Sequence, residues 1–448
     1  MTVRNIFNSD TLDELDRRYE LTLVSYYASR LNEIWPGRWS KIQLLKWTCP
    51  RWRLPTLQGF LINVVFHWNL HAFFRCHKLF TMAQRLAFYK EKHRLRYYFD
   101  KQVGSRIVSL FRRNNNGKDL LRDLVYLTPI QKQLRTVNAL LVSSTDQAKD
   151  QQLIYTFHKI GIPVVALVHS FDNLTSKGLL STQPDRLLVW NEIMRKEAID
   201  YHGFHIDKVD IVGVPQYETY RKLVVEACES SFRKRLRIPD GTKVITFAGS
   251  AIHMFPDEMR FVEDFLSAIS RGSCGNTILV MRTHPPDIRK EAYSEKYLTS
   301  ELPIRLDFPD SGFSALNTGD VGSSQSIREF VELMRYSDVV INLSSTVVLD
   351  AILFDTPAIC LNFNYLEKEA VNAAHMHHKC EHYHAIVQSN AVDFPNNLEE
   401  LLRAVNRYLR NPQDKSAERR QLANQIMPNV PTSKLIAEAI DKAIVEHV

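Results

Sequence analysis

Two short apolar runs on either side of a helical segment constrain the fold of this chain most strongly. The runs are DVVIN (338–342) and PAICLNF (357–363), and polar residues or proline bound them. Uninterrupted apolar runs of this length are typical of parallel strands that are buried on both faces of a sheet. The segment between them is long enough for one helix. The sequence here therefore predicts a β–α–β unit and an α/β fold.

Small hydroxyl side chains lie where the first of these strands would end and the helix would begin. They belong to Ser344, Ser345 and Thr346. The first backbone N–H groups of a helix have no partner within it, and they lie at the positive end of the helix dipole. The triplet therefore predicts an anion site, for which phosphate is the usual ligand. The alternative is that these residues only cap the helix.

Strand-like and helix-like segments alternate through most of the chain. A helix at 11–19 and a strand at 20–27 begin the pattern. A first set then has strands at 138–144, 162–170, 185–192 and 208–215 with helices at 150–161 and 193–203, and a second set has strands at 243–251, 276–287, 338–342 and 357–363 with helices at 256–272 and 326–336. Such alternation predicts right-handed crossovers and parallel sheets.

The fold class predicted is α/β, with two facing doubly wound (Rossmann-like) domains. The N-terminal domain would span 1–225 and the C-terminal domain 226–410, and the helices of 411–448 could pack back on the first domain. The loops at the carboxyl ends of both sheets would then line one cleft, where open α/β sheets bind their ligands.

A basic and aromatic insert interrupts the first domain at residues 30–136. It carries 21 lysines and arginines against five acidic residues, although the whole chain has a net charge of only +7, and it holds five of the six tryptophans. Tryptophan beside lysine and arginine suits an anionic lipid interface. We expect a helical, membrane-facing insert centred on 59–89. A buried helical subdomain with a solvated basic face and a nucleic-acid-binding surface are the alternatives, and the prediction names no nucleic acid as partner.

Cysteines and targeting signals place the expected protein in the cytoplasm. The six cysteines form no CxxC pair, and the N-terminal sequence MTVRNIFNSD has no basic segment followed by an apolar core. Reduced thiols and a peripheral position on the cytoplasmic face of a membrane are therefore expected.

Polar residues follow most of the predicted strands, at the positions where ligands bind. In the first set, His169, Asp172 and Lys177 follow the apolar segment ALV (166–168). In the second set these residues are Gly249, Ser250, Arg282, His284, Ser344, Ser345 and Thr346. A histidine and a carboxylate on one side, facing an arginine, a histidine and hydroxyls on the other, suit a base that activates a nucleophile next to a bound phosphate. Glu192 is a further candidate on a loop.

The segments RTHPPD (282–287) and DVVINLSSTVVLDAILFDTP (338–357) carry a family resemblance. They are similar to the R-x-H-P and D-Y-S-S-x-x-x-D elements of GT-B glycosyltransferase-type proteins, which include CDP-glycerol glycerophosphotransferases and bacterial surface-polysaccharide glycosyltransferases. VHSFDNLTSKG (168–178) more loosely resembles the family's His-Gly…Lys element, with Ser170 in place of the glycine. The resemblance extends over residues 138–365.

The resemblance implies roles for several residues. Arg282 and His284 would contact the donor diphosphate, Ser345 and Thr346 would bind phosphate, and Asp350 would lie one turn further along the same helix. An inverting transferase needs a general base for the acceptor hydroxyl, and His169 is the candidate. The alternative for His169 is a structural, hydrogen-bonded histidine.

Other chemistries find less support in the sequence. His375, His377, His378, His382 and His384 crowd around Cys380, but their spacing does not match a closed zinc site, and no metal is predicted. The glycine-rich loops GxxxxGK[ST] and GxGxxG are absent, which argues against a P-loop kinase and a dehydrogenase.

The predicted function is therefore a transferase that moves a sugar or a polyol phosphate from a nucleotide-activated donor, without a cofactor, to a hydroxyl acceptor. The acceptor would be lipid-linked or a glycan, as in the synthesis of surface polysaccharide or glycolipid. A nucleotide-sugar 2-epimerase and a non-catalytic GT-B-like binding protein are the alternatives. The basic aromatic insert argues against the epimerase, which needs no membrane acceptor.

Overall fold

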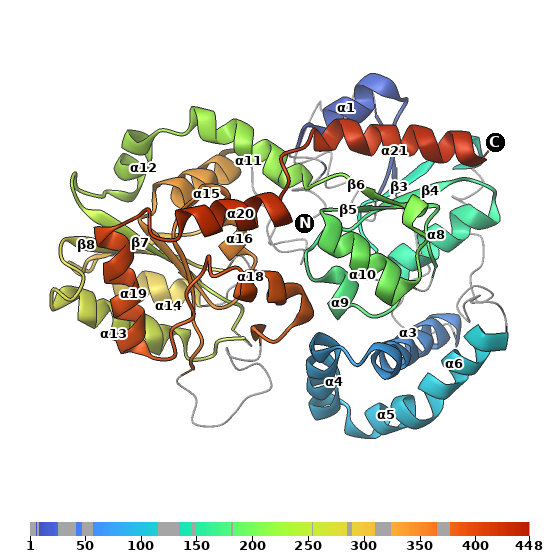
Figure 1. Cartoon of the computed structure of the whole chain (residues 1–448), viewed down its shortest axis with the longest axis horizontal. Helices are drawn as coiled ribbons and strands as arrows, with labels where there is room; N and C mark the ends of the chain where they lie inside the picture. The colour runs from blue at the N-terminus through green and yellow to red at the C-terminus, as the bar shows by residue number, and fades with distance from the viewer. Residues whose placement is uncertain are drawn as a thin grey trace. The chain divides into compact units, whose positions relative to one another are not determined.

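The computed structural model describes residues 6, 9–25, 42–46, 57–114, 134–145, 148–180, 182–252, 254–284, 289–309, 324–364 and 377–447. Contacts between Cα atoms divide the chain into two compact units (Figure 1). We call residues 4–215 with 430–448 the first unit and residues 216–429 the second unit. The sequence places domain boundaries at 225 and 410, and the two units meet at 215/216 and 429/430.

A parallel sheet of four strands forms the centre of the first unit. Its order is β3-β4-β5-β6, with β3 at Leu140–Val142, β4 at Val164–Leu167, β5 at Arg186–Val189 and β6 at Val209–Ile211. The connecting helices are α8 (Ala148–Lys159), α9 (Asn173–Ser176) and α10 (Glu192–His202), and single 3-10 turns lie at Leu134–Thr136 and Ile206–Lys208. All residues of β4 and β5 are buried, as the apolar runs predict.

The N-terminal helix and strand form as predicted, but the strand does not join this sheet among the described residues. Helix α1 spans Asp10–Arg18, and β1 (Thr22–Ser25) pairs in parallel with β2 (Gln43–Lys46) in a separate two-stranded sheet. Strand β2 lies inside the insert, so the expectation of an all-helical insert is wrong at this point.

The rest of the described insert is helical, and much of it packs on the body of the first unit. It contains α3 (Leu57–His77), α4 (Phe80–Lys92), α5 (Arg94–Phe99), a π-helical turn η2 (Asp100–Gly104) and α6 (Ser105–Asn114). Phe73 and Met82 are buried in a cluster with Leu179, and the Phe73 ring stacks on His202 at a centroid distance of 5.3 Å. These apolar side chains of α3 and α4 thus form a core, which is the arrangement expected of a helical subdomain rather than of a membrane-facing helix.

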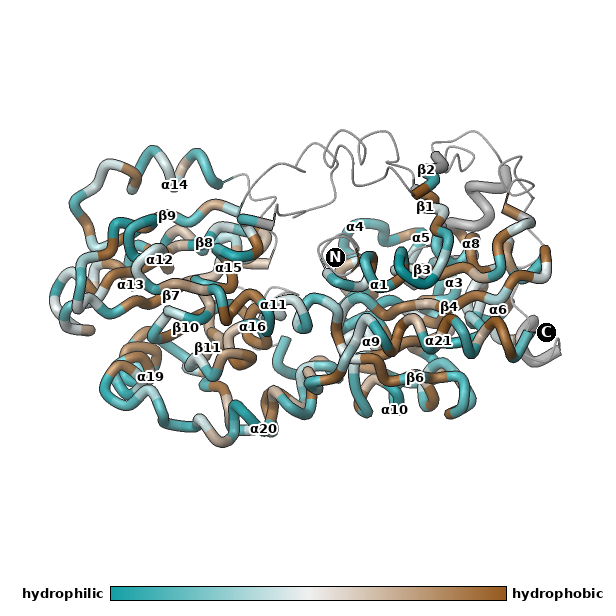
Figure 2. Tube along the Cα trace, turned by 90° about the horizontal axis from the view of Figure 1, so that it is seen from above, coloured by the Kyte–Doolittle hydropathy of each residue, from teal (hydrophilic) through white to brown (hydrophobic). Residues whose placement is uncertain are grey.

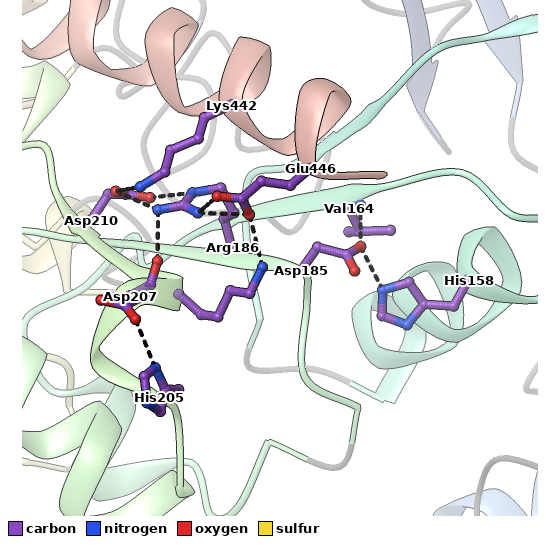
Figure 3. A network of polar contacts seen from close by, with 10 residues as sticks. His158, Val164, Asp185, Arg186, His205, Asp207, Asp210, Lys442 and Glu446 are labelled. Carbon is purple, nitrogen blue, oxygen red and sulfur yellow. Dashed lines mark hydrogen bonds and ion pairs between the residues drawn. The ribbon is translucent and has the colours of Figure 1, made fainter. Parts of the chain in front are cut away.

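A buried arginine joins the C-terminal helix α21 (Thr432–His447) to the sheet of the first unit (Figure 3). Arg186 at the start of β5 is fully buried, and its guanidinium donates to Asp210 at 2.6 and 2.7 Å and to Glu446 at 3.0 and 3.1 Å. Lys208 also reaches Glu446, at 2.7 Å. These ion pairs lie at the amino ends of the strands, away from the ends where ligands bind.

The sheet of the second unit is doubly wound. Its five parallel strands are β7 (Lys243–Ala248), β8 (Thr277–Arg282), β9 (Ile304–Asp307), β10 (Val339–Asn342) and β11 (Ala358–Cys360), in the order β11-β10-β7-β8-β9. The strand order reverses between β7 and β10, since β8 and β9 extend the sheet on one side of β7 and β10 and β11 on the other. In the first unit, the described strands follow in sequence order.

Helices and an apolar core surround this second sheet. The helices are α11 (Pro215–Glu226), α12 (Glu229–Leu236), α13 (Glu258–Ser270), α14 (Lys290–Tyr297), α15 (Ser324–Tyr336), α16 (Val347–Leu353), α18 (His384–Gln388), α19 (Leu398–Arg410) and α20 (Ser416–Ile426), with a 3-10 turn at Glu381–Tyr383. Phe247, Phe261 and Phe265 pack at the centre of the core. Strands β4 and β10 are buried apolar segments, and in Figure 2 brown marks hydrophobic residues in central strands and in parts of the helices.

The predicted α/β fold with two units built on parallel sheets is confirmed. No helix among the described residues is both long enough and apolar enough to cross a bilayer.

Candidate functional site

Three strand ends of the second unit bring most of the predicted donor-site residues to one edge of the sheet. Asn342 at the end of β10 pairs with Ala248 of β7, and Ala248 pairs with Arg282 of β8. The loops that follow these strands therefore begin side by side. They carry Gly249, Ser250, His284, Ser344, Ser345 and Thr346. This edge includes the point between β7 and β10 where the strand order reverses, and ligands of open α/β sheets bind at such points.

The turn after β10 is held firmly by its neighbours. Ser344 has a positive φ of 46°, which is uncommon for a residue other than glycine. Its Oγ lies 2.5 Å from Nε2 of His378, and the ring of His378 packs edge-on against Phe394 at 4.4 Å. The Tyr383 hydroxyl donates to the carbonyl of Ser345 at 3.2 Å. His378, which the sequence suggested only as a possible metal ligand, is thus part of this turn.

The same turn satisfies backbone groups that the sequence assigned to an anion. The Ser345 N–H donates to the side-chain oxygen of Asn342 at 2.9 Å, and the Val347 N–H donates to Oγ of Ser345 at 3.0 Å. Helix α16 is only seven residues long, and Thr346 at its N-cap makes no side-chain capping bond. Ser345 therefore acts as a local cap, as the alternative reading of the triplet predicts.

A buried ion pair that could not be inferred from the sequence shapes the loop after β7. Glu258 of α13 is fully buried, and its carboxylate accepts the Ser250 N–H at 2.6 Å and the Tyr293 hydroxyl at 3.1 Å. Arg289 lies 3.1 Å from the same carboxylate and donates to the Ser250 carbonyl at 2.6 Å. A Cβ atom on Gly249 would approach Oε1 of Glu258 to 3.0 Å, so this backbone position has little room for a side chain.

Arg282 is engaged in a second buried ion pair. Its guanidinium contacts the carboxylate of Asp307 and lies over the Phe330 ring at 4.8 Å, and Arg235 reaches the same carboxylate at 2.8 Å. Burial opposes ionisation of Asp307, but the charges of Arg282 and Arg235 outweigh it and hold the pKa below its usual value. The structure thus gives Arg282 a partner within the protein, whereas the resemblance implies a contact with the donor.

Asp307→Asn should make the second unit less stable, by about 1–3 kcal/mol, because the buried guanidinium of Arg282 and the partly buried guanidinium of Arg235 both lose their charged acceptor. The stabilisation by Asp307 is present above the unfolded-state pKa and is lost as the pH falls through the lowered folded-state pKa. The variant should therefore lose less stability than the natural protein between pH 7 and pH 3. Urea unfolding at both pH values measures this, and equal losses would contradict the role of Asp307.

The remaining predicted residues of the second unit lie close to these loops. His284 is half-buried, two residues beyond the end of β8. Thr283 is buried, and its hydroxyl has no hydrogen-bond partner among the described residues. Asp350 is buried in α16 and accepts a hydrogen bond from Gln216 at 3.2 Å. This hydrogen bond joins α16 to α11.

In the first unit, the predicted base lies on the loop after β4. His169 is half-buried, and its Nδ1 lies 3.3 Å from Nδ2 of Asn173. The Trp190 indole donates to the Val168 carbonyl at 2.8 Å and so fixes the start of the loop. Asn173 is a neighbour of His169 that the sequence did not identify.

Asp172, predicted to be catalytic with His169, organises the loop itself. Its carboxylate accepts hydrogen bonds from the hydroxyls of Ser170 and Ser176, both at 2.5 Å, and Lys177 lies 3.8 Å away. These contacts close the turn that leads into α9. The structure gives Asp172 and Lys177 a local structural role here.

Glu192 lies on the surface at the start of α10. Its carboxylate pairs with Arg195 in the next turn and is 69% exposed, so the pair is one of the weakly stabilising surface ion pairs. The helix is capped by the preceding Asn191, which accepts the Met194 N–H at 3.0 Å.

The histidine-rich segment gathers no metal-like cluster where the structure describes it. His375 lies outside the described residues. Within the described ranges, no three side chains from histidine, cysteine, aspartate and glutamate are placed to hold a metal ion.

Comparisons with known proteins give likenesses of fold at low similarity. No protein-family model matches the chain, and no curated protein matches it in sequence. Similar solved structures include a Listeria monocytogenes protein described as a UDP-N-acetylglucosamine 2-epimerase, at 13% identity over 71% of this chain and 78% of that one, with a TM-score of 0.49. A glycosyltransferase from Rickettsia africae ESF-5 is 11% identical over 100% of this chain and 95% of its own, also with a TM-score of 0.49.

A third similar structure is that of the wall teichoic acid polymerase TagF with CDPG. It is 12% identical over 69% of this chain and 73% of its own, with a TM-score of 0.45. These proteins are of the GT-B glycosyltransferase type that the sequence resembles. The TM-scores of these three structures are all below 0.5, so the likenesses carry no argument about activity.

Proposed function

We propose that the protein is a transferase that moves a sugar or a polyol phosphate from a nucleotide-activated donor to a hydroxyl acceptor. The observation that supports this most is the side-by-side placement of the loops after β7, β8 and β10 at the reversal of strand order in the second unit. Small residues, most of them with hydroxyl side chains, gather there at Gly249, Ser250 and Ser344–Thr346. Such a surface suits a nucleoside diphosphate.

Within this proposal, His284 is the main donor contact among the predicted side chains. Arg282 already has a carboxylate partner in Asp307, and this leaves His284 to meet the charge that develops on the leaving nucleotide, which is a nucleoside diphosphate in transfer of a sugar and a nucleoside monophosphate in transfer of a polyol phosphate. Hydrogen bonds and dipoles placed beforehand are effective at this task. The hydroxyls of Ser345 and Thr346 would add phosphate contacts. The proposal assigns no cofactor and no metal ion to the reaction.

His169 would take the proton from the acceptor hydroxyl. The acceptor is proposed to be lipid-linked or a glycan, and the protein to act in the cytoplasm on the inner face of a membrane. Asn173 would hold the imidazole of His169 in place through the contact at Nδ1.

A donor-turnover assay tests the proposed activity. The purified protein is incubated with CDP-, UDP-, GDP- and CMP-linked donors, with and without a hydroxyl acceptor, and products are followed by NMR. A transferase releases the free nucleotide from one donor, and faster with the acceptor. Epimerised sugar that is still attached to the nucleotide would replace the proposal with the 2-epimerase. Donor that binds but stays intact would indicate a binding protein.

His284→Ala should weaken donor binding about 10- to 100-fold, since a hydrogen bond to a charged group contributes about 1.5–3 kcal/mol. The melting temperature should stay nearly unchanged, because the residue lies on a loop. Isothermal titration with the turned-over donor measures the affinity. His384→Ala is the matched control, since His384 is exposed in the same unit and its Nε2–H donates to the Lys379 carbonyl at 3.1 Å. Equal affinities for the two variants would remove His284 from the site.

A further inference from the structure

An apolar stripe runs along the outer side of the helical segment formed by α5, η2 and α6. Leu95, Phe99, Val103, Ile107 and Leu110 lie three or four residues apart, and Tyr98 lies beside Phe99. All six are exposed: Leu95 (89%), Tyr98 (43%), Phe99 (54%), Val103 (42%), Ile107 (39%) and Leu110 (59%). They make up six of the fourteen large hydrophobic side chains that are exposed among the described residues. Such clustering is unusual for a surface that faces only water.

The inner side of the same segment is fully used by the fold. Asp100 is 1% exposed and accepts hydrogen bonds from the Trp68 indole at 2.9 Å and the Tyr89 hydroxyl at 3.1 Å. Gly104 lies directly against the Trp68 ring, where a Cβ atom would come within 2.1 Å. Val108 is 1% exposed on the same side. These contacts fix the rotation of the helix and turn the apolar stripe outward.

The charge beside the stripe is strongly basic. Residues 90–114 contain eight lysines and arginines against two acidic residues, and one of these two is the buried Asp100. Lys90, Arg94, Lys101 and Arg106 are exposed. Lys90 lies over the ring of Tyr98, a member of the stripe, at 5.6 Å, and Lys90 and Lys101 lie over the neighbouring Tyr97 ring at 6.0 and 5.9 Å. Apolar side chains flanked by cations are typical of helices that lie in the interface of an anionic bilayer.

We propose that the face of α5–η2–α6 is the surface by which this protein binds an anionic lipid bilayer. Leu95, Phe99, Val103, Ile107 and Leu110 enter the interface, and the neighbouring lysines and arginines meet the lipid phosphates. This face rests on the proposed function, which already includes a membrane surface, and it takes the place of the 59–89 segment as the contact with that surface. Such a contact needs no spanning helix, and none occurs among the described residues, because an interfacial helix lies in the plane of the membrane.

Vesicle flotation with the full-length protein tests this surface. The probes are phosphatidylcholine vesicles with and without half of the lipid replaced by phosphatidylglycerol. Binding should require the anionic lipid and fall at least tenfold between 50 and 500 mM NaCl. Absence of binding to either vesicle, or equal binding to both, would overturn the proposal. Concentration-dependent dimerisation in place of binding would assign the face to a second copy of the chain.

Two sets of variants separate the apolar and the basic contributions. Leu95→Ser/Phe99→Ser/Leu110→Ser should reduce the partition to anionic vesicles at least tenfold, and Arg94→Gln/Lys101→Gln/Arg106→Gln should lower it and flatten the salt dependence. The matched control is Val225→Ser/Leu298→Ser/Val445→Ser, whose side chains are 84%, 68% and 75% exposed elsewhere and should leave binding unchanged. Circular dichroism confirms folding. Unchanged binding by the first triple variant would overturn the apolar contact. The vesicle experiment contains no nucleotide-activated donor. A failure to bind vesicles would therefore overturn the membrane surface without affecting the result of the donor-turnover assay.

Discussion

Replacing His169 by alanine should lower transferase turnover about a hundredfold or more, with little change in donor affinity. A general base removes the acceptor proton only as the new bond forms, so its loss affects the rate of the chemical step more than binding. The effect is measured as kcat at saturating donor, beside the donor dissociation constant. His205→Ala is the control, since His205 is exposed in the same unit with its side chain 74% accessible.

The same series distinguishes the base from a structural histidine. His169→Gln keeps a hydrogen bond to the neighbouring Asn173 but cannot take a proton at neutral pH, so it should be as slow as the alanine variant while keeping the natural melting temperature. Full recovery of turnover with glutamine would show that His169 only supports the loop. Loss of donor affinity as the main effect would place it on the donor side.

Arg186→Met should destabilise the first unit by about 3–5 kcal/mol, the usual cost of removing one partner from a buried ion pair. Burial disfavours the charge of Arg186, but the hydrogen bonds and charges of Asp210 and Glu446 outweigh it and raise the pKa of the guanidinium. Without Arg186 the two carboxylates would repel each other beneath α21 (Figure 3).

Urea unfolding followed by tryptophan fluorescence measures this change in one unit. All six tryptophans lie between residues 35 and 190 and so belong to the first unit. Arg195→Met removes a surface pair with Glu192 and should change the free energy of unfolding by less than about 0.5 kcal/mol. An Arg186→Met midpoint equal to that of this control would contradict the role of the buried arginine.

The central strands were predictable from the sequence because a strand that is buried on both faces consists of an uninterrupted run of apolar residues. Strands β4, β7 and β10 follow this rule. The segment IRLD of β9 was missed, since this edge strand alternates charged and apolar residues and has neighbours on one side only. The strand β2 was missed because QLLK is too short to separate from a helical segment.

The position of the candidate site could be predicted from the sequence, but the contacts of its charged side chains could not. Strand ends predict which loops carry ligands, and in the second unit the paired register brings those loops together. The position of a strand end does not predict which buried charged side chains will pair. Glu258 and Arg289 meet from separate helical segments, and Arg282 meets Asp307 across 25 residues of sequence. Only the folded structure shows that these charged side chains pair with each other within the protein and not with a ligand.

The apolar stripe could have been predicted from the sequence. Leu95, Phe99, Val103 and Ile107 recur every four residues, which is the spacing of one helix face. The tryptophan-rich and uniformly apolar segments nearby carry a stronger signal. Since hydrophobicity alone does not separate a core helix from an interfacial one, the packing of Phe73 and Met82 was needed to decide between them.

Hydrogen exchange with and without bound donor tests the central claim most directly. The claim is that the strand-end loops of the second unit bind the nucleotide-activated donor. Saturation with the donor that is turned over should slow amide exchange in 249–252 and 342–347, and the His284→Ala variant should show less protection at the same donor concentration. Protection confined to other segments, or no protection by any of the four classes of donor, would contradict the claim.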